Sequence, residues 1–283
     1  MTVGIGAPSG ADVAACCASL YGSWAVELLL GESFHPGGLA ETRALLRAGG
    51  LRRGSRLLDV GCGLGASARL ASDEFRYVVE GIDPSIAASE RGSARAQATG
   101  SPIRLRVATV TDLPYPAGSF DGVLAECALS TVPKDEALAE IRRVLRPGGR
   151  LLISDVTRTA SVEWAAEAAP LLAAAFCLAG AWLPDELGER LGGAGFAVER
   201  TIDESAELIR LLDRIAARVE LLTALSRDLA LDPVGLPGDH TIDLGLPSIS
   251  LADGLSALAA ARAAAEAGAL GYTAVVAMRR SAS

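Results

Sequence analysis

The residues best suited to chemistry form a glycine-rich turn with an acid in front of it. Asp59 ends a short apolar run, and alternate positions after it are glycine: Gly61, Gly63 and Gly65. Glycine adopts positive φ without strain and leaves no Cβ between the main chain and a ligand. The next residues, 66–70, predict the start of a helix, whose first N–H groups are free to bind a ligand. The pattern therefore predicts a nucleotide-like cofactor at the edge of an α/β sheet.

Further strands and helices must position this turn. Five segments have the composition of strands, at 57–60, 77–83, 103–110, 118–125 and 151–154. The second of them ends at Asp83, about 20 residues after the glycines, where an acid is expected to bind ribose hydroxyls. A Pro-Gly-Gly turn at 147–149 separates a helix from the fifth strand, which ends at Asp155, a pocket residue or a helix cap. Strands that alternate with helices predict a parallel sheet.

The glycine spacing decides between two cofactors. A dinucleotide site has the spacing G-x-G-x-x-G, whereas this chain has G-x-G-x-G. The series D-V-G-C-G-L-G, G-I-D, L-P-Y-P-A-G-S-F-D and V-L-R-P-G-G-R-L-L-I-S-D resembles the class I S-adenosylmethionine-dependent methyltransferases, in their small-molecule (type 11) form. The resemblance implies a Rossmann-like fold with a seven-stranded, mostly parallel sheet, helices on both faces and S-adenosylmethionine as cofactor. It implies no metal.

The resemblance also assigns roles to positions. Gly61, Gly63 and Gly65 would carry the methionine end of the cofactor. Asp59 would face its ammonium group, and Asp83 its ribose hydroxyls. Cofactor contacts are also expected from Cys62, Pro84, Val110, Thr111 and Glu126.

Two of these contacts have alternatives. Relatives often carry an acid at the end of the third strand, but Ala108 and Thr109 occupy that place here. The adenine contact would then come from the N–H of Val110 or from Asp112. Glu126, after the fourth strand, pairs with a cationic acceptor or caps a helix.

Four cysteines suggest a particular methyl acceptor. Cys16 and Cys17 lie in A-C-C, Cys127 in E-C-A-L-S-T, and Cys177 in F-C-L-A-G-A-W. Over roughly residues 12–200 this set resembles arsenite methyltransferases. The resemblance implies that trivalent arsenic, a soft acceptor, is held by Cys127 and Cys177 as catalytic groups, with Cys16 and Cys17 as further substrate ligands.

The family's further cysteine before the glycine turn is missing, and the loop there contains His35 instead. His35 precedes a proline in a glycine-rich loop, so we expect it to be more exposed than a core histidine and to orient the acceptor. The cysteines also allow a simpler interpretation, since free cysteine often packs as a small buried hydrophobe. The alternative function is then methylation of carbon, oxygen or nitrogen of a small organic metabolite. A third hypothesis is a catalytically silent protein that retains the fold.

Composition excludes several other classes. The 283-residue chain has a formal net charge of −8, which argues against a nucleic-acid substrate. No run of 18 or more apolar residues predicts a membrane helix, and the first residues lack a signal-peptide pattern. We therefore expect a cytoplasmic monomer or homodimer that acts on a small molecule or a metalloid, with its cysteines as thiols.

The chain divides into four predicted parts. These are an N-terminal helical cap at 1–50, the cofactor-binding core at 51–200, a helical insertion at 201–271, and a last strand and tail at 272–283. The insertion would contain helices at 206–228 and 251–267, and it is either a lid over the substrate or a packing and dimerisation element.

Overall fold

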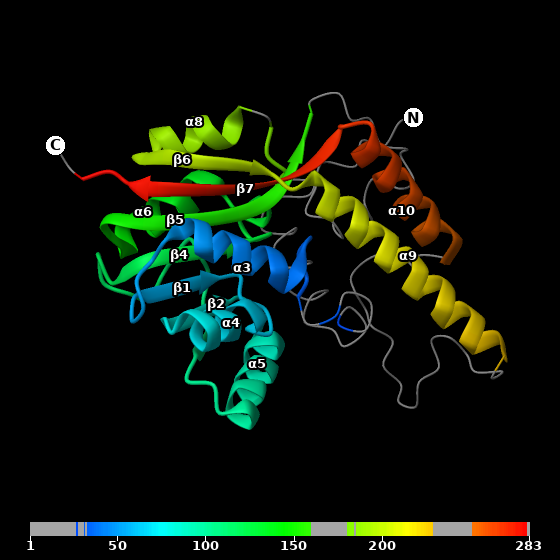
Figure 1. Ribbon diagram of the computed structural model, residues 1–283, viewed down its shortest axis with the longest axis horizontal. Coiled ribbons are helices and arrows are strands. Elements are labelled where there is room, and N and C mark those ends of the chain that lie inside the picture. Colours follow the sequence, from blue (N-terminus) through cyan, green and yellow to red (C-terminus); the bar gives the residue numbers. More distant parts are fainter. Residues whose placement is uncertain are drawn as a thin grey trace, which may run out of the picture.

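A computed structural model of the chain describes Glu27, Gly31 and residues 33–159, 180–183, 185–228 and 251–281. These residues form one seven-stranded sheet in the order β3-β2-β1-β4-β5-β7-β6, drawn in Figure 1. The strands are β1 (Arg56–Val60), β2 (Val78–Asp83), β3 (Arg104–Val107), β4 (Phe120–Glu126), β5 (Leu145–Arg158), β6 (Phe196–Asp203) and β7 (Leu270–Arg279). Strands β1 to β5 are parallel, and β7 runs antiparallel between β5 and β6. The predicted Rossmann-like methyltransferase fold is confirmed.

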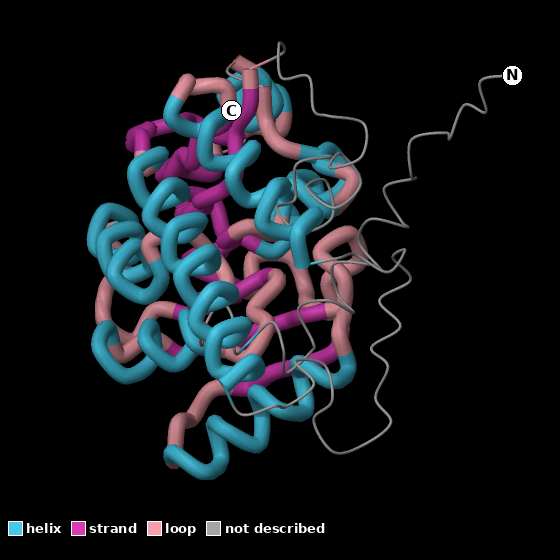
Figure 2. Tube along the Cα trace, turned by 90° about the vertical axis from the view of Figure 1, so that its right-hand side faces the viewer, coloured by secondary structure: helices cyan, strands magenta, loops and turns pink. Residues whose placement is uncertain are grey.

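Helices cover both faces of this sheet, as the turned view of Figure 2 also shows. On one face lie α3 (Gly38–Gly49), α4 (Ala66–Phe75) and α5 (Ile86–Thr99), and on the other α6 (Lys134–Val144) and α8 (Glu186–Gly193). Neighbouring residues of a strand point to opposite faces. On β1, Leu57 therefore packs with α3 and α4, while Leu58 packs with α6. Because both faces are buried, most residues of the central strands β1 and β4 are apolar.

The insertion before the last strand is helical. Helices α9 (Ser205–Asp228) and α10 (Leu251–Glu266) connect β6 to β7 and lie side by side beyond the end of the sheet (Figure 1). Their apolar residues form a separate cluster with Tyr272 and Val156 of the sheet. Within the part of the chain that the structure describes, no helix is both long and apolar enough to cross a bilayer.

Three predicted boundaries were wrong. Strand β3 ends at Val107 because Ala108 donates to the Asp83 carbonyl and the chain then turns between Thr109 and Asp112. Strand β5 starts at Leu145, before the Pro-Gly-Gly turn, because Leu145 pairs with Phe120 and the register shifts afterwards.

The same strand also continues beyond Asp155, to Arg158. Asp155 is thus a buried strand residue that accepts hydrogen bonds from the N–H and hydroxyl of Ser130. It neither ends the strand nor lines the cavity described below.

Candidate functional site

A cavity of about 470 Å³ lies where β1, β2 and β4 end. In α/β sheets, ligands bind in the crevice at the carboxyl ends of the parallel strands. The loop before α3, the turn after β1, the end of β2, residues 108–111 and residues 126–133 all line it. Segments that are distant in sequence thus converge on one space of a size suited to a small ligand.

The turn after β1 presents bare main chain to this cavity. Gly61 and Gly63 have φ of 70° and 52°, and both line the cavity with Cys62 between them. A Cβ on Gly61 would lie 2.8 Å from the Cβ of Ala128. Glycine is therefore required at position 61 both by its backbone conformation and by its close neighbour.

Two other predicted residues of this turn have packing roles. The sulfur of Cys62 would lie 2.8 Å from a Cβ placed on Gly81 of β2, so Cys62 fills the space beside that glycine as well as lining the cavity. Burial raises the pKa of the Cys62 thiol well above its usual value. Gly65 does not line the cavity. It precedes α4 with φ 73°, and a Cβ there would lie 2.9 Å from a methyl carbon of Leu105. Gly65 thus allows close packing against β3, and its contact with the cofactor stays a prediction.

Asp59 offers an acceptor that no protein group satisfies. The side chain is 2% exposed and lines the cavity, and its Oδ2 has no hydrogen-bond partner among the described residues. The carboxyl group accepts the N–H of Ala68 in the first turn of α4. Burial, and then the negative charges of Glu126 and Asp83, raise the pKa of Asp59 well above its usual value. A cationic ligand group would satisfy this oxygen and stabilise its charge.

Asp83 connects the end of β2 to the glycine turn. Its Oδ2 accepts the N–H of Gly63 at 2.9 Å, and its Oδ1 accepts the N–H of Ser85 at 2.8 Å. Burial raises the pKa of Asp83, while these two N–H groups oppose the shift. Asp83 and Pro84 both line the cavity, as expected for a ribose-binding position.

The structure separates the two candidates for the adenine contact. Val110 and Thr111 line the cavity together with Ala108 and Thr109. Asp112 is exposed and is not part of the lining. Of the two, Val110 is the one placed to contact a ligand in this cavity.

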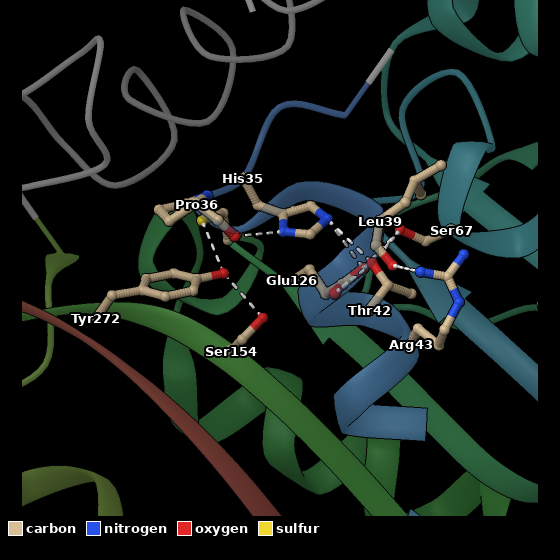
Figure 3. Close-up of polar contacts among 10 residues, drawn as sticks. His35, Pro36, Leu39, Thr42, Arg43, Ser67, Glu126, Ser154 and Tyr272 are labelled. Atoms are coloured by element: carbon tan, nitrogen blue, oxygen red, sulfur yellow. Dashed lines mark hydrogen bonds and ion pairs between the residues drawn. The ribbon is translucent and has the colours of Figure 1, made fainter. Parts of the chain in front are cut away.

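Glu126 accepts the hydrogen bonds of a buried network that the sequence did not predict. Thr42 of α3 donates to its two carboxylate oxygens at 2.9 and 3.1 Å, and Ser67 of α4 donates to Oε2 at 2.6 Å. His35 Nε2 lies 3.4 Å from Oε2 (Figure 3). Glu126 therefore does not cap a helix. It is held by side chains of two helices at the cavity wall.

His35 is buried, which corrects the prediction of an exposed histidine. It is 6% exposed because the loop brings its ring against Thr42 and Glu126. Nδ1 donates to the carbonyl of Pro36 at 3.0 Å, and Thr42 Oγ1 lies 3.2 Å from Nε2 (Figure 3). The ring lines the cavity in a fixed orientation. A role toward the acceptor therefore remains a prediction for His35.

Cys127 lines the cavity just after β4, in a left-handed conformation with φ 51°. Its thiol lies 3.7 Å from the Tyr272 hydroxyl, which donates to Ser154 at 2.8 Å. Burial, and then the charge of Asp155, raise the pKa of Cys127 well above its usual value. Such a thiol is a poor thiolate, and thiolate is the form that binds soft metals.

The other predicted thiophile ligands, Cys16, Cys17 and Cys177, lie outside the described residues. Among the residues that are described, no three histidines, cysteines or acids group as a metal site.

Glu41 makes the stability of the folded chain depend on pH. It is buried on α3, and burial, with the charges of Glu204, Glu126 and Glu207 as further causes, raises its pKa from 4.5 to about 7. The unfolded chain loses this proton near pH 4.5 and the folded chain near pH 7. The contribution of Glu41 to stability is therefore fully present below pH 4.5 and is lost as the pH rises to about 7.

We expect Glu41→Gln to remove this loss, because glutamine stays neutral. Urea unfolding of the variant should show a smaller decrease in stability between pH 5 and pH 8 than the original chain. Glu136→Gln, an exposed change on α6, is the matched control. Equal pH dependence in Glu41→Gln and the original chain would contradict the assignment.

Comparison with known proteins agrees with this geometry. Residues 58–153 match the family model described as a methyltransferase domain. The 27-O-demethylrifamycin SV methyltransferase of Amycolatopsis mediterranei is 39% identical over 122 residues, 41% of this chain and 45% of that protein. The chain spans half or less of the length of the first curated relatives that it matches.

Solved structures show the same fold. Phosphoethanolamine N-methyltransferase 2 of Haemonchus contortus, in complex with phosphomonomethylethanolamine and S-adenosylhomocysteine, aligns with a TM-score of 0.72 at 19% identity, over 91% of this chain and 57% of that one. The [4+2]-cyclase SpnF aligns with a TM-score of 0.71 at 20% identity, over 98% of both chains. Residues 58–153 thus match a methyltransferase domain, and the chain shares the fold of these solved structures. A particular likeness to arsenite methyltransferases is not among these findings.

Proposed function

We propose that this chain, built around the methyltransferase domain at residues 58–153, is an S-adenosylmethionine-dependent methyltransferase of a small organic molecule. The observation that carries the proposal is the rim of the cavity. An oxygen of Asp59 that has no partner among the described residues, and the carboxylate of Asp83, flank the bare main chain of Gly61 and Gly63 there. That arrangement suits a ligand with a cationic group at one end and hydroxyls beyond it.

The residues of the cavity divide by the part of the cofactor they fit. Asp59 would hold the ammonium group, Asp83 the ribose hydroxyls, and Val110 with Thr111 the adenine edge. When bound, S-adenosylmethionine would supply an electrophilic methyl group: the acceptor atom bonds to the methyl carbon in line as the carbon–sulfur bond breaks, and S-adenosylhomocysteine leaves. The chain's part is to hold the acceptor on that line and to exclude water.

His35, Glu126 and Cys127 are the polar side chains we assign to the acceptor side. His35 would orient the acceptor, because its ring is fixed by Pro36 and Thr42. Residues 1–50 would form the cap and residues 201–271 a lid beside the core at 51–200. The last predicted part, 272–283, overlaps β7, which begins two residues earlier at Leu270. The assembly would be a monomer or a homodimer.

The acceptor atom is a carbon, an oxygen or a nitrogen. The relatives support this breadth, since their names describe an O-demethylated rifamycin and phosphoethanolamine as substrates. The raised pKa of Cys127 favours an organic acceptor over one gripped by thiolates. Methylation of trivalent arsenic held by Cys127 and Cys177 stays as the second candidate, because Cys127 does line the cavity.

Titration of the purified chain with S-adenosylhomocysteine in a calorimeter tests the proposal. We expect one ligand per chain. A chain that binds neither S-adenosylhomocysteine nor S-adenosylmethionine would be a protein that keeps the fold without this activity, and the proposal would fail.

Cys127→Ser separates the two acceptor classes. We expect serine to keep S-adenosylhomocysteine affinity within about twofold, because its hydroxyl can replace the thiol as a donor to Tyr272. Transfer of radiolabelled methyl groups to arsenite with glutathione is measured alongside. If the original chain methylates arsenite and the variant does not, arsenic replaces the organic acceptor in the proposal.

A further inference from the structure

Acids dominate the ionisable side chains that line the cavity, and His35 is the one possible base among the described lining residues. Asp59, Asp83 and Glu126 line it at the ends of β1, β2 and β4, and all three side chains are buried. Glu41 lies close enough to Glu126 for their charges to interact. Of the three lining acids, Glu126 adjoins Cys127 on the side assigned to the acceptor, while Asp59 and Asp83 lie on the side assigned to the cofactor.

Little in the chain opposes this charge at the cavity. Among the described lining residues there is no lysine or arginine. The segments outside the described residues (1–26, 28–30, 32, 160–179, 184, 229–250 and 282–283) contain none either. Those segments therefore add no lysine or arginine to the cavity, which leaves Arg227, near the end of α9, as the one lysine or arginine to which this statement does not apply.

The carboxylate of Glu126 is held without a lysine or arginine partner. Its hydrogen-bond donors are the neutral hydroxyls of Thr42 and Ser67, with the His35 ring nearby. Asp59 has an oxygen with no partner at all among the described residues. Two like charges a few ångströms apart repel strongly away from bulk water, and a cleft lined by one sign concentrates ligands of the opposite sign.

We propose, on the basis of the proposed function, that the methyl acceptor carries no anionic group into this cavity: it is a neutral molecule or a protonated amine. A phosphate or carboxylate on the acceptor side would face the buried Glu126, with Asp59 and Asp83 beyond it, and the described lining offers no lysine or arginine to pair with it. The inference distinguishes this chain's acceptor from the phosphorylated molecule bound by the phosphoethanolamine N-methyltransferase of the same fold.

Cys127 can report the charge preference before the acceptor is known, because its side chain lines the cavity. The probes are three methanethiosulfonates: a trimethylammonium-ethyl, a sulfonatoethyl and a neutral methyl reagent. Each transfers its thio group to the thiolate and releases methanesulfinate. Rates are measured on a full chain with Cys16, Cys17, Cys62 and Cys177 replaced by alanine. If the variant with four cysteines replaced does not fold, the rates are measured on the original chain, and mass spectrometry identifies the peptide that carries Cys127.

The raised pKa of Cys127 slows all three reagents alike, so the ratio of rates is informative. Relative to N-acetylcysteine amide, we expect the cationic reagent to be favoured over the anionic one by about tenfold or more. Glu126→Gln should reduce that preference at least about threefold. Glu189→Gln, an exposed change of the same charge on α8, should not alter it.

An anionic reagent that reacts as fast as the cationic one would overturn the inference. So would a Cys127 that no reagent reaches, because the thiol would then not face an open acceptor space. Titration with S-adenosylhomocysteine decides the proposed function separately. A chain that binds this ligand but lacks the charge preference loses only the substrate class.

Discussion

Replacing Asp83 with alanine should weaken S-adenosylhomocysteine binding about 100-fold. The carboxylate does two things at once in the structure. It accepts the N–H of Gly63 at 2.9 Å, which holds the glycine turn, and it lines the cavity where ribose hydroxyls are expected. Hydrogen bonds to a charged group contribute about 1.5–3 kcal/mol each, so the loss of one or two accounts for the effect. Calorimetric titration measures it.

Asp73→Ala is the control for this change. Asp73 lies exposed on α4, so its removal alters the net charge equally without touching the cavity. Its affinity for the ligand should stay within about twofold. If Asp83→Ala bound S-adenosylhomocysteine with an affinity within threefold of the original chain, this carboxylate would not be part of the cofactor site.

The second large effect is expected at the glycine turn. Gly61→Ala should lower the free energy of unfolding by about 3 kcal/mol. Part of this cost is the left-handed backbone with φ 70°, and part is the added methyl group 2.8 Å from Ala128. The displaced turn should also lose most of its affinity for S-adenosylhomocysteine. Urea unfolding and calorimetry report the two losses.

Gly50→Ala isolates the backbone part of that cost. Gly50 follows α3 with φ 62°, and a Cβ there would meet nothing within 4 Å. Alanine at this position should cost only about 1 kcal/mol and leave ligand binding unchanged. Equal losses of stability in the two variants would mean that the contact with Ala128 has no energetic weight.

The strands and the cofactor side of the cavity were predictable because local signals encode them. An apolar run, then an acid, then glycine is a strand followed by a turn, and it correctly placed Asp59, Gly61 and Asp83 at the cavity. Helices α9 and α10 were likewise predicted within a residue at each end, the second from its alanine content, since alanine is the strongest helix former.

The acceptor side was harder to predict because it depends on contacts between distant segments. Thr42 and Glu126 are 84 residues apart, and neither residue type alone indicates the bond between them. His35 was expected to be exposed from its loop composition, but tertiary contacts bury it. The Pro-Gly-Gly turn was expected to precede β5. Because Leu145 already pairs with Phe120, the strand begins before the turn and contains it. Only the position of Ser67, in the first turn of a helix next to the glycines, was a usable signal.

The joint between β6 and β7 separates two parts of the molecule that can evolve independently. The two strands are antiparallel neighbours. At the base of the insertion, the backbone N–H of Glu204 donates to the Tyr272 carbonyl, and the Ser205 hydroxyl accepts the Tyr272 N–H. These bonds hold the end of β6 against β7 whatever the length of the insertion between the two strands. Closing a longer loop costs little extra entropy. Helices can be lengthened, shortened or exchanged there while the rim around Asp59 and Asp83 keeps its shape. As the proposed lid, this helical pair is a place where the chain can change without altering the cofactor side of the site.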